Sequence, residues 1–302
     1  MASVLENLPR ASRVAILRLR SLGDCVLTTP ALDILRHARA DLRVGVVVED
    51  RFRAIFEGNS DVDEILPPEP KAVRQFRPQL CVNFHGGNRS AWIAALSGAR
   101  YRAGFGHFRH QFLYNLRIPR AQEILGVERT VHTAEHMASA MFWLGAPAMK
   151  VPRAQLVSGA VGPPGPVAVI HPVGATPQKI WRADGFLEVA RHLRQSGLEV
   201  VFIGAETDDL SPFAEFRVLQ GRPLSEIKDL LARAALFVGN DSGPAHMAAA
   251  FGLPVVVIFG ESDPNIWGPW QTACEVVRAH GGIGNVVASQ AIAATARLRV
   301  NA

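Results

Sequence analysis

Residues 235–260 read ALFVGNDSGPAHMAAAFGLPVVVIFG. The apolar run 235–239 predicts a buried strand, the small-residue segment 243–252 predicts a helix, and the β-branched run 254–260 predicts a second strand. A strand, a helix and a strand in this order are typical of a parallel sheet, because the helix carries the chain back to the end where the first strand began. The stretch therefore predicts the α/β class.

The same alternation runs through the rest of the chain. In segment 28–40, Leu32, Leu35 and Ala38 keep helical spacing, and Pro30 suits the first turn, where a missing N–H costs nothing. The other expected helices are 183–197 and 225–234. The other expected strands are 14–20, 43–48, 62–66, 79–84, 101–105, 167–171 and 199–204.

A segment rich in proline and glycine, residues 145–166, divides this pattern into halves and is typical of a linker. The 302 residues suit two domains of about 150 residues each. We therefore predict two doubly wound parallel-sheet domains, 1–155 and 156–302, that face an interdomain cleft. The final segment is a candidate to pack back on the first domain. Ligands of such sheets bind beyond the carboxyl ends of the strands.

The charge is uneven along the chain. The net charge is +5, and no acidic residue lies between Glu69 and Glu123. That interval holds nine basic residues: Lys71, Arg74, Arg77, Arg89, Arg100, Arg102, Arg109, Arg117 and Arg120. A field of one sign favours an anionic partner, such as nucleic acid, a phosphorylated lipid or a phosphate-rich sugar. The alternative is a solvated face of an arginine-rich protein.

Compartment signals favour the cytoplasm. Cys25, Cys81 and Cys274 are scattered without a paired spacing, which is typical of thiols in a reducing environment. Residues 1–13 lack the apolar core of a signal peptide, and the longest apolar runs are far shorter than the roughly 20 residues that a membrane span needs. We expect a cytoplasmic protein.

Three loops after strands of the second half carry reactive groups. In residues 239–250, Asp241 and Ser242 lead into a helix that opens at Gly243, with His246 in its first turn. Open N–H groups and the dipole at a helix start favour a phosphate. Asp241 as a cap only, and His246 as a structural residue, are the alternatives.

The other two loops are 171–181 and 204–209. In the first, Gly174 permits close backbone approach, Thr176 offers a hydroxyl and Lys179 offers a compact positive charge, a combination that suits a diphosphate. In the second, Glu206 follows a strand end and could accept hydrogen bonds from ribose hydroxyls, although an ordinary surface acid is an equal alternative.

Near the N-terminus, SLGDCVLTTPAL (21–32) follows an apolar run. A phosphate loop would not carry a carboxylate, so Asp24 suggests another role: with Gly23 making a tight turn, it could face the cleft as a base. The alternative is that Asp24 caps the following helix. Dinucleotide, P-loop and serine-hydrolase motifs are absent from the sequence, and no cysteine–histidine cluster has metal-ligand spacing, so we expect no metal.

Three stretches together resemble glycosyltransferase family 9, the heptosyltransferases that add heptose from ADP-heptose to the inner core of lipopolysaccharide. They are RLRSLGDCVLTTPAL (18–32), HPVGATPQKIW (171–181) and VGNDSGPAHMAAAFGLPVVVIFGESDP (238–264), and the resemblance runs over roughly residues 13 to 270. It implies a GT-B fold of two Rossmann-like domains, the second binding mainly the nucleotide sugar and the first mainly the acceptor.

The resemblance also implies roles for single residues. Asp24 falls on the family's general base, and Lys179 falls on its diphosphate lysine, with Thr176 beside it. The donor-binding signature falls on Asp241, Ser242, Gly243 and His246, and the ribose acid falls on Glu206.

These roles describe an inverting transfer. Asp24 takes the proton of the acceptor hydroxyl, and Lys179 with the helix start after Asp241 stabilises the leaving nucleoside diphosphate without a metal or another cofactor. Within the basic segment 70–122, His85, Asn88 and Arg89 follow a strand end and are the candidate acceptor-binding residues. The expected partners are a nucleotide sugar and an anionic phosphorylated glycolipid, with peripheral contact at the cytoplasmic face of the inner membrane. Nucleic acid is not an expected partner in this interpretation.

Two alternatives come from other classes. A nucleotide-sugar epimerase of the GT-B fold would need no acceptor. A nucleic-acid-binding protein would use the basic segment 70–122, which contains eight aromatic residues between 76 and 114.

Overall fold

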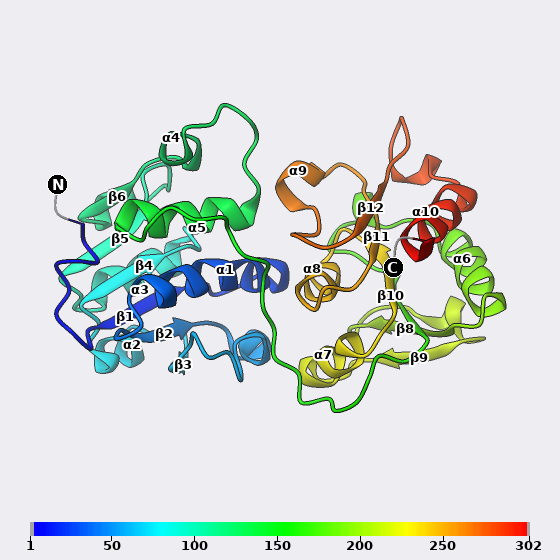
Figure 1. The fold of residues 1–302 in the computed structure, drawn as a ribbon, viewed down its shortest axis with the longest axis horizontal. Coiled ribbons are helices and arrows are strands. Elements are labelled where there is room, and N and C mark those ends of the chain that lie inside the picture. Colours follow the sequence, from blue (N-terminus) through cyan, green and yellow to red (C-terminus); the bar gives the residue numbers. More distant parts are fainter. Residues whose placement is uncertain (1–2, 301–302) are drawn as a thin grey trace. The chain divides into compact units, whose positions relative to one another are not determined.

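The computed structural model describes residues 3–300. The chain divides into two compact units, Met1–Val157 and Ser158–Ala302. Each unit contains one six-stranded sheet in which every neighbouring pair of strands is parallel (Figure 1). The α/β class, with two Rossmann-like sheets, is therefore confirmed. Residues 146–161, which include the change from one unit to the other, contain no helix or strand.

The first sheet has the strand order β3-β2-β1-β4-β5-β6. This is the order of a dinucleotide-binding sheet, and the direction of winding reverses between β1 and β4. The strands are β1 (Arg13–Leu17), β2 (Arg43–Val47), β3 (Glu64–Leu66), β4 (Leu80–Asn83), β5 (Tyr101–Phe105) and β6 (Leu116–Ile118).

Helices cover both faces of the first sheet. Alternate residues of β1 point to opposite faces, and Ala15 and Leu17 belong to a buried cluster with apolar residues of α2 and α3. On the other face α1 packs against α5 (Figure 1). The helices are α1 (Leu22–Ala38), α2 (Pro70–Phe76), α3 (Asn88–Leu96), α4 (Ala121–Leu125) and α5 (Thr133–Leu144), with short 3₁₀ turns η1 (Asp50–Ile55) and η2 (Gln111–Leu113).

The second sheet repeats the first. Its order is β12-β11-β10-β7-β8-β9, so that β7 and β10 stand where β1 and β4 stand in the first unit. The strands are β7 (Val167–His171), β8 (Glu199–Gly204), β9 (Arg217–Gln220), β10 (Leu236–Asn240), β11 (Val255–Ile258) and β12 (Cys274–Val277). β10 and β11 are buried at every residue and β7 and β8 at their central residues, as expected for strands of a parallel sheet that are covered on both faces.

The helices of the second unit begin after strand ends, as the sequence predicts. The final helix packs against α6 and β12. The elements are α6 (Ala183–Gln195), α7 (Leu224–Ala232), α8 (Gly243–Ala250), α9 (Pro264–Trp267) and α10 (Ala288–Val300), with 3₁₀ turns η3 (Pro177–Lys179), η4 (Ser211–Phe213) and η5 (Ile283–Asn285).

The strands that sequence patterns miss are edge strands. β6, β9 and β12 each pair with only one neighbour, and most of their residues are exposed or half-buried. An edge strand has less apolar surface to bury, so it lacks the continuous apolar run that marks a central strand.

The helix α1 differs from its prediction. It begins at Leu22 instead of residue 28, so Gly23 lies in the helix rather than in a turn, and Pro30 lies inside it rather than in its first turn. Proline at position 30 leaves the Val26 carbonyl without its usual helical N–H donor. The Thr29 hydroxyl donates to that carbonyl at 2.8 Å, which satisfies the freed acceptor.

Candidate functional site

In each sheet, predicted site residues follow the two central strands between which the winding reverses. The winding reverses between β1 and β4, and again between β7 and β10, and ligands of open α/β sheets bind beyond the carboxyl ends of the strands at such a point. Asp24 follows β1 and His85 follows β4, whereas Lys179 follows β7 and Asp241 follows β10. Each unit thus carries its candidate residues where an open α/β sheet binds ligands.

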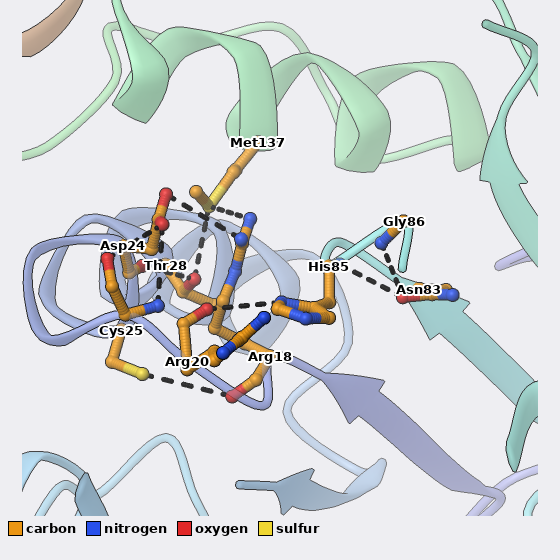
Figure 2. A network of polar contacts seen from close by, with 10 residues as sticks. Arg18, Arg20, Asp24, Cys25, Thr28, Asn83, His85, Gly86 and Met137 are labelled. Atoms are coloured by element: carbon orange, nitrogen blue, oxygen red, sulfur yellow. Dashed lines mark hydrogen bonds and ion pairs between the residues drawn. The ribbon is translucent and has the colours of Figure 1, made fainter. Parts of the chain in front are cut away.

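In the first unit, a buried arginine stands beside Asp24. Arg18 follows β1 directly, and its side chain is only 8% exposed. Its guanidinium lies 3.6 Å from the Asp24 carboxylate and 3.5 Å from the Met137 sulfur (Figure 2). Burial lowers the pKa of Arg18, while Asp24 acts in the opposite direction. The carboxylate is therefore the counter-charge of a guanidinium that has little access to water.

Asp24, the third residue of α1, also takes part in capping that helix. Ser21 is the N-cap of α1, and its hydroxyl and backbone N–H donate to Asp24 Oδ2 at 3.0 and 3.4 Å. The capping geometry, which is the alternative role for Asp24, is thus present. Because Oδ2 faces Ser21 while Oδ1 faces Arg18, both sides of the carboxylate are oriented. The side chain nevertheless remains 20% exposed, which leaves it open to another contact.

The end of β4 lies next to Asp24 and its partners Arg18 and Ser21, which together form the Asp24 network (Figure 2). Asn83 is fully buried, and its side-chain oxygen accepts hydrogen bonds from the backbone N–H groups of His85 and Gly86 at 2.9 and 3.2 Å. Its amide donates to the Tyr114 hydroxyl at 2.7 Å. His85 Nδ1 lies 3.1 Å from the Arg20 carbonyl oxygen. Asn83 therefore fixes the loop that brings the imidazole toward the residues after β1.

The environment of His85 favours its neutral form. Burial is the main reason that its pKa is lowered, and the positive charge of Arg18 acts in the same direction. A neutral imidazole can donate one hydrogen bond and accept another, so His85 is suited to contacting a polar ligand group near Asp24.

The structure does not bring Asn88 and Arg89 to Asp24. Asn88 Oδ1 lies 2.6 Å from His110 Nε2, and Arg89 donates to the Pro68 carbonyl at 2.8 Å. Both side chains are exposed at the start of α3. Of the three candidate acceptor residues, only His85 therefore joins the Asp24 network.

In the second unit, Lys179 and Asp241 form an ion pair. Lys179 Nζ lies 2.7 Å from Asp241 Oδ2, and the two side chains are 32% and 7% exposed. Lys179 ends η3 in the loop after β7, and Asp241 directly follows β10. Two of the loops that the sequence singles out are thus joined by this contact.

A buried asparagine holds the same two loops together. Asn240, the last residue of β10, is fully buried. Its amide donates to the carbonyls of Pro172 and Val173 at 2.9 and 3.3 Å, and its oxygen accepts from the Trp181 backbone N–H at 3.1 Å. Both ends of the loop that carries Lys179 are therefore attached to the end of β10.

The start of α8 lies directly after this pair. Ser242 is the N-cap, Gly243 is the first helical residue, and His246 is buried in the first turn. Within the described residues, the Ser242 hydroxyl oxygen is buried without a hydrogen-bond partner. A buried hydroxyl normally finds a partner, so Ser242 is available to a ligand at the helix start.

The two remaining donor candidates lie at the same edge of the sheet. Thr176 is the exposed N-cap residue of η3, two residues after Gly174, where an added Cβ would lie 3.2 Å from the Lys179 carbonyl oxygen. Glu206 is exposed two residues beyond β8. Neither side chain contacts the Lys179–Asp241 pair in the interactions that the structure gives for residues 3–300.

Sequence patterns missed three polar residues of these networks, Arg18, Asn83 and Asn240. All three are buried and lie at the end of a strand or directly after it. A polar side chain that terminates an apolar run is the available signal, because a buried polar group must find partners in the loops around it.

The sequence of the chain and its fold of two Rossmann-like sheets are similar to those of known proteins. The family described as glycosyltransferase family 9 (heptosyltransferase) matches residues 71–291, which is more than half of the chain. The chain belongs to glycosyltransferase family 9. The resemblance seen in the three sequence stretches is thereby confirmed, and the chain is a glycosyltransferase.

Individual family 9 proteins are similar to this chain over most of its length. Lipopolysaccharide heptosyltransferase 3 of Escherichia coli K12 is 26% identical over 290 residues, which cover 83% of each chain. The crystal structure of a family 9 glycosyltransferase from Veillonella parvula has a TM-score of 0.85 at 21% identity, covering 97% of this chain and 98% of that one. E. coli heptosyltransferase WaaC with ADP has a TM-score of 0.79 at 21% identity, covering 96% and 100%.

Family 9 membership favours glycosyl transfer over the epimerase and nucleic-acid alternatives. Two further observations concern the part of the chain that the structure describes. Within it, no three His, Cys, Asp or Glu side chains gather as metal ligands could. Among residues 3–300, no helix is both long enough and apolar enough to span a membrane.

Proposed function

We propose that this family 9 enzyme transfers a heptose, or a related sugar, from an ADP-sugar to the inner core of lipopolysaccharide, with inversion at the anomeric carbon. The observation that carries the proposal is the family match over residues 71–291, which includes every donor-loop residue. The relatives support the substrates: one is a lipopolysaccharide heptosyltransferase, and WaaC was solved with ADP.

In this proposal the donor diphosphate binds at the start of α8. The helix start offers open N–H groups and the positive end of a dipole. The Ser242 hydroxyl, which is buried without a partner among the described residues, adds a donor, and Lys179 adds a positive charge held 2.7 Å from Asp241. These groups stabilise the negative charge that develops on the leaving nucleoside diphosphate, and the proposal requires no other cofactor.

Two other residues complete the donor site in this proposal. Glu206 lies beyond β8, next to β7 in the sheet, so its carboxylate can accept hydrogen bonds from the ribose hydroxyls. His246, in the first turn of α8, contacts the donor from the helix side.

Asp24 is the proposed general base. It lies outside residues 71–291, so its role rests on its local geometry and on the resemblance of residues 18–32. Ser21 and Arg18 orient the two carboxylate oxygens, and the side chain remains 20% exposed. An oriented carboxylate with access to a ligand can take the proton of an acceptor hydroxyl as that oxygen attacks the sugar.

The acceptor in this proposal is an anionic glycolipid. His85 lies beside Asp24 and its partners (Figure 2). The segment between Glu69 and Glu123 contains lysine and arginine residues but no aspartate or glutamate. A field of one sign favours an acceptor that carries phosphates or sugar carboxylates.

The substitution Asp24→Asn tests the proposal. The amide keeps the shape of the carboxylate but cannot take a proton, so we expect the turnover number to fall by about 10²–10⁴-fold. ADP affinity, measured by calorimetry, should stay within about twofold, because the donor groups lie in the second unit. Transfer from a panel of ADP-sugars to lipopolysaccharide core acceptors provides the turnover assay.

A matched control lies in the same helix. Asp33 in α1 is a carboxylate with an 8% exposed side chain, paired with His37 outside the Asp24 network. Asp33→Asn should keep nearly normal turnover. Wild-type turnover by Asp24→Asn would reject Asp24 as the base, and a nucleotide sugar that changes configuration without any acceptor would reject transfer in favour of epimerisation.

A further inference from the structure

An exposed apolar surface lies on the outer side of α3. Trp92 and Leu96 are 53% and 49% exposed and stand one turn apart, on the same face of the helix. Phe112 is 66% exposed and belongs to η2, which packs beside α3. These three side chains are named the α3 surface. Large apolar side chains normally lose most of their contact with water on folding, so the exposure of three of them on adjoining elements needs an explanation.

The local structure holds these exposed side chains in place. Asn88 at the start of α3 bonds to His110, just before η2, at 2.6 Å. The His110 and Phe112 rings have centroids 5.9 Å apart. The inner face of α3, which includes Ile93 and Ala94, is buried in the core of the unit. The outer face is therefore presented by a packed helix and not by a loose loop.

Positively charged residues lie near the α3 surface, on α3 itself and on the neighbouring helix α2. Arg89 lies one turn before Trp92 on α3, and it donates to Pro68 at the approach to α2. The Arg74 side chain of α2 passes beside Gly98, just after α3. The exposed side chains that provide this charge are Lys71, Arg74, Arg89 and Arg109. All four lie between Glu69 and Glu123, an interval of the sequence that contains no acidic residue.

We propose that the α3 surface docks on a lipid bilayer that contains anionic headgroups. Aromatic and leucine side chains on one face of a helix insert at the boundary between headgroups and acyl chains, while neighbouring arginines and lysines attract anionic lipids. Tryptophan is particularly suited to this boundary because its ring is amphipathic. The combination of apolar tips and basic flanks matches that surface.

The charge also argues against a second copy of the chain as the occupant. A symmetric pair formed through the α3 surface would place Arg89 and its basic neighbours opposite their own copies, and like charges at close range repel. An anionic membrane offers the opposite charge together with an apolar interior.

The position of α3 gives the docking a consequence. α3 begins at Asn88, three residues after His85, at the carboxyl edge of the first sheet. Docking through α3 would therefore hold that edge of the unit close to the bilayer. The proposal goes beyond the transfer reaction and can be tested without donor or acceptor.

The test is sedimentation of the full-length protein with vesicles. We expect binding to vesicles of phosphatidylcholine with phosphatidylglycerol, weak binding to phosphatidylcholine alone, and loss of binding as salt rises. The double substitution Trp92→Ser and Phe112→Ser should lower the partition coefficient about tenfold or more. The control Trp143→Ser changes a 36% exposed tryptophan on α5 and should leave vesicle binding unchanged.

Three results would overturn the proposal. One is equal binding by the wild type and the double variant. Another is equal loss of binding in the Trp143→Ser control. The third is a dimer in solution that the double variant dissociates, which would assign the surface to a second copy. Melting temperatures within a few degrees establish that the variants are folded, and Leu96→Ser replaces the double variant if that one does not fold.

Discussion

Two asparagines illustrate how single residues organise this protein. Asn83 ends β4 and Asn240 ends β10, which are corresponding strands of the two repeated sheets. Both are fully buried, and both bond to backbone groups of the loops at the switch points. A buried amide has donors and an acceptor in one plane, so it can join loop groups that no helix or strand satisfies. Each unit thus has a buried asparagine at the end of its fourth strand that holds a neighbouring loop in place.

Asn240→Ala should destabilise the second unit and loosen its donor loop. The substitution leaves the Trp181 N–H and the Pro172 carbonyl without their buried partner, and we expect a loss of about 1–3 kcal/mol in the free energy of unfolding. ADP affinity should fall as well, because the loop that carries Lys179 is then held less firmly. Denaturant unfolding and calorimetry measure the two effects.

The control for this prediction is Asn265→Ala. Asn265 is exposed, and its amide bonds only to Asp263 among the side-chain contacts given for it. We expect a change within about 0.5 kcal/mol for it. Equal stability losses in the two variants would contradict the role assigned to Asn240.

At the scale of elements, three separate loops meet around η3. The loop after β7 carries η3, the end of β10 bonds to both sides of it through Asn240, and Gly260 follows β11. A Cβ at Gly260 would collide with the backbone carbonyl of Gln178 in η3. The glycine therefore permits an approach of two backbones that any side chain would prevent. The proposed donor loop therefore has its shape because of contacts from the ends of two neighbouring strands.

Gly260→Ala should therefore displace η3. Because the obstacle is backbone and not the tip of a flexible side chain, we expect a loss of about 1–3 kcal/mol in stability together with weaker ADP binding. The matched variant is Gly284→Ala, whose added Cβ meets no heavy atom within 4 Å. That variant should be neutral or slightly stabilising. Thermal unfolding with and without ADP compares the two, and a stable Gly260→Ala that binds ADP normally would refute this view.

At the scale of the whole molecule, each unit contains a half-buried histidine whose surroundings favour its neutral form. In the first unit, burial lowers the pKa of His136 to about 4, and the His136 ring stacks on Phe105 at 3.9 Å. In the second unit, burial lowers the pKa of His171, at the end of β7, to about 4. Both histidines therefore resist protonation while the protein is folded.

Stability should decrease as the pH falls from about 6.5 to about 4. Above about 6.5 both states hold these histidines neutral; below it the unfolded chain binds protons that the folded protein does not. The contribution is thus complete at neutral pH and is lost on acidification. Calorimetric scans through this range should show a decreasing melting temperature, and His136→Gln with His171→Gln should reduce the slope. A slope that the double variant leaves unchanged would exclude these two groups as its source.

The sequence alone determines the class of the fold and the location of the reactive loops. Stretches such as 235–260 reveal the fold class, because the spacing of apolar residues along a strand or helix is a local property of the sequence. The polar groups of Asp241, Ser242 and Lys179 stand where those apolar patterns end, so their loops are visible too.

Only the tertiary structure decides the order of the strands, the edge strands β6, β9 and β12, and the partners of the buried polar groups. The Arg18–Asp24 pair and the contacts of Asn83 and Asn240 join residues that come together through the packing of helices and strands. The physical reason is that burial and pairing depend on neighbours distant in sequence: Asn240 reaches Pro172 across 68 positions of the chain, and no local pattern records that contact.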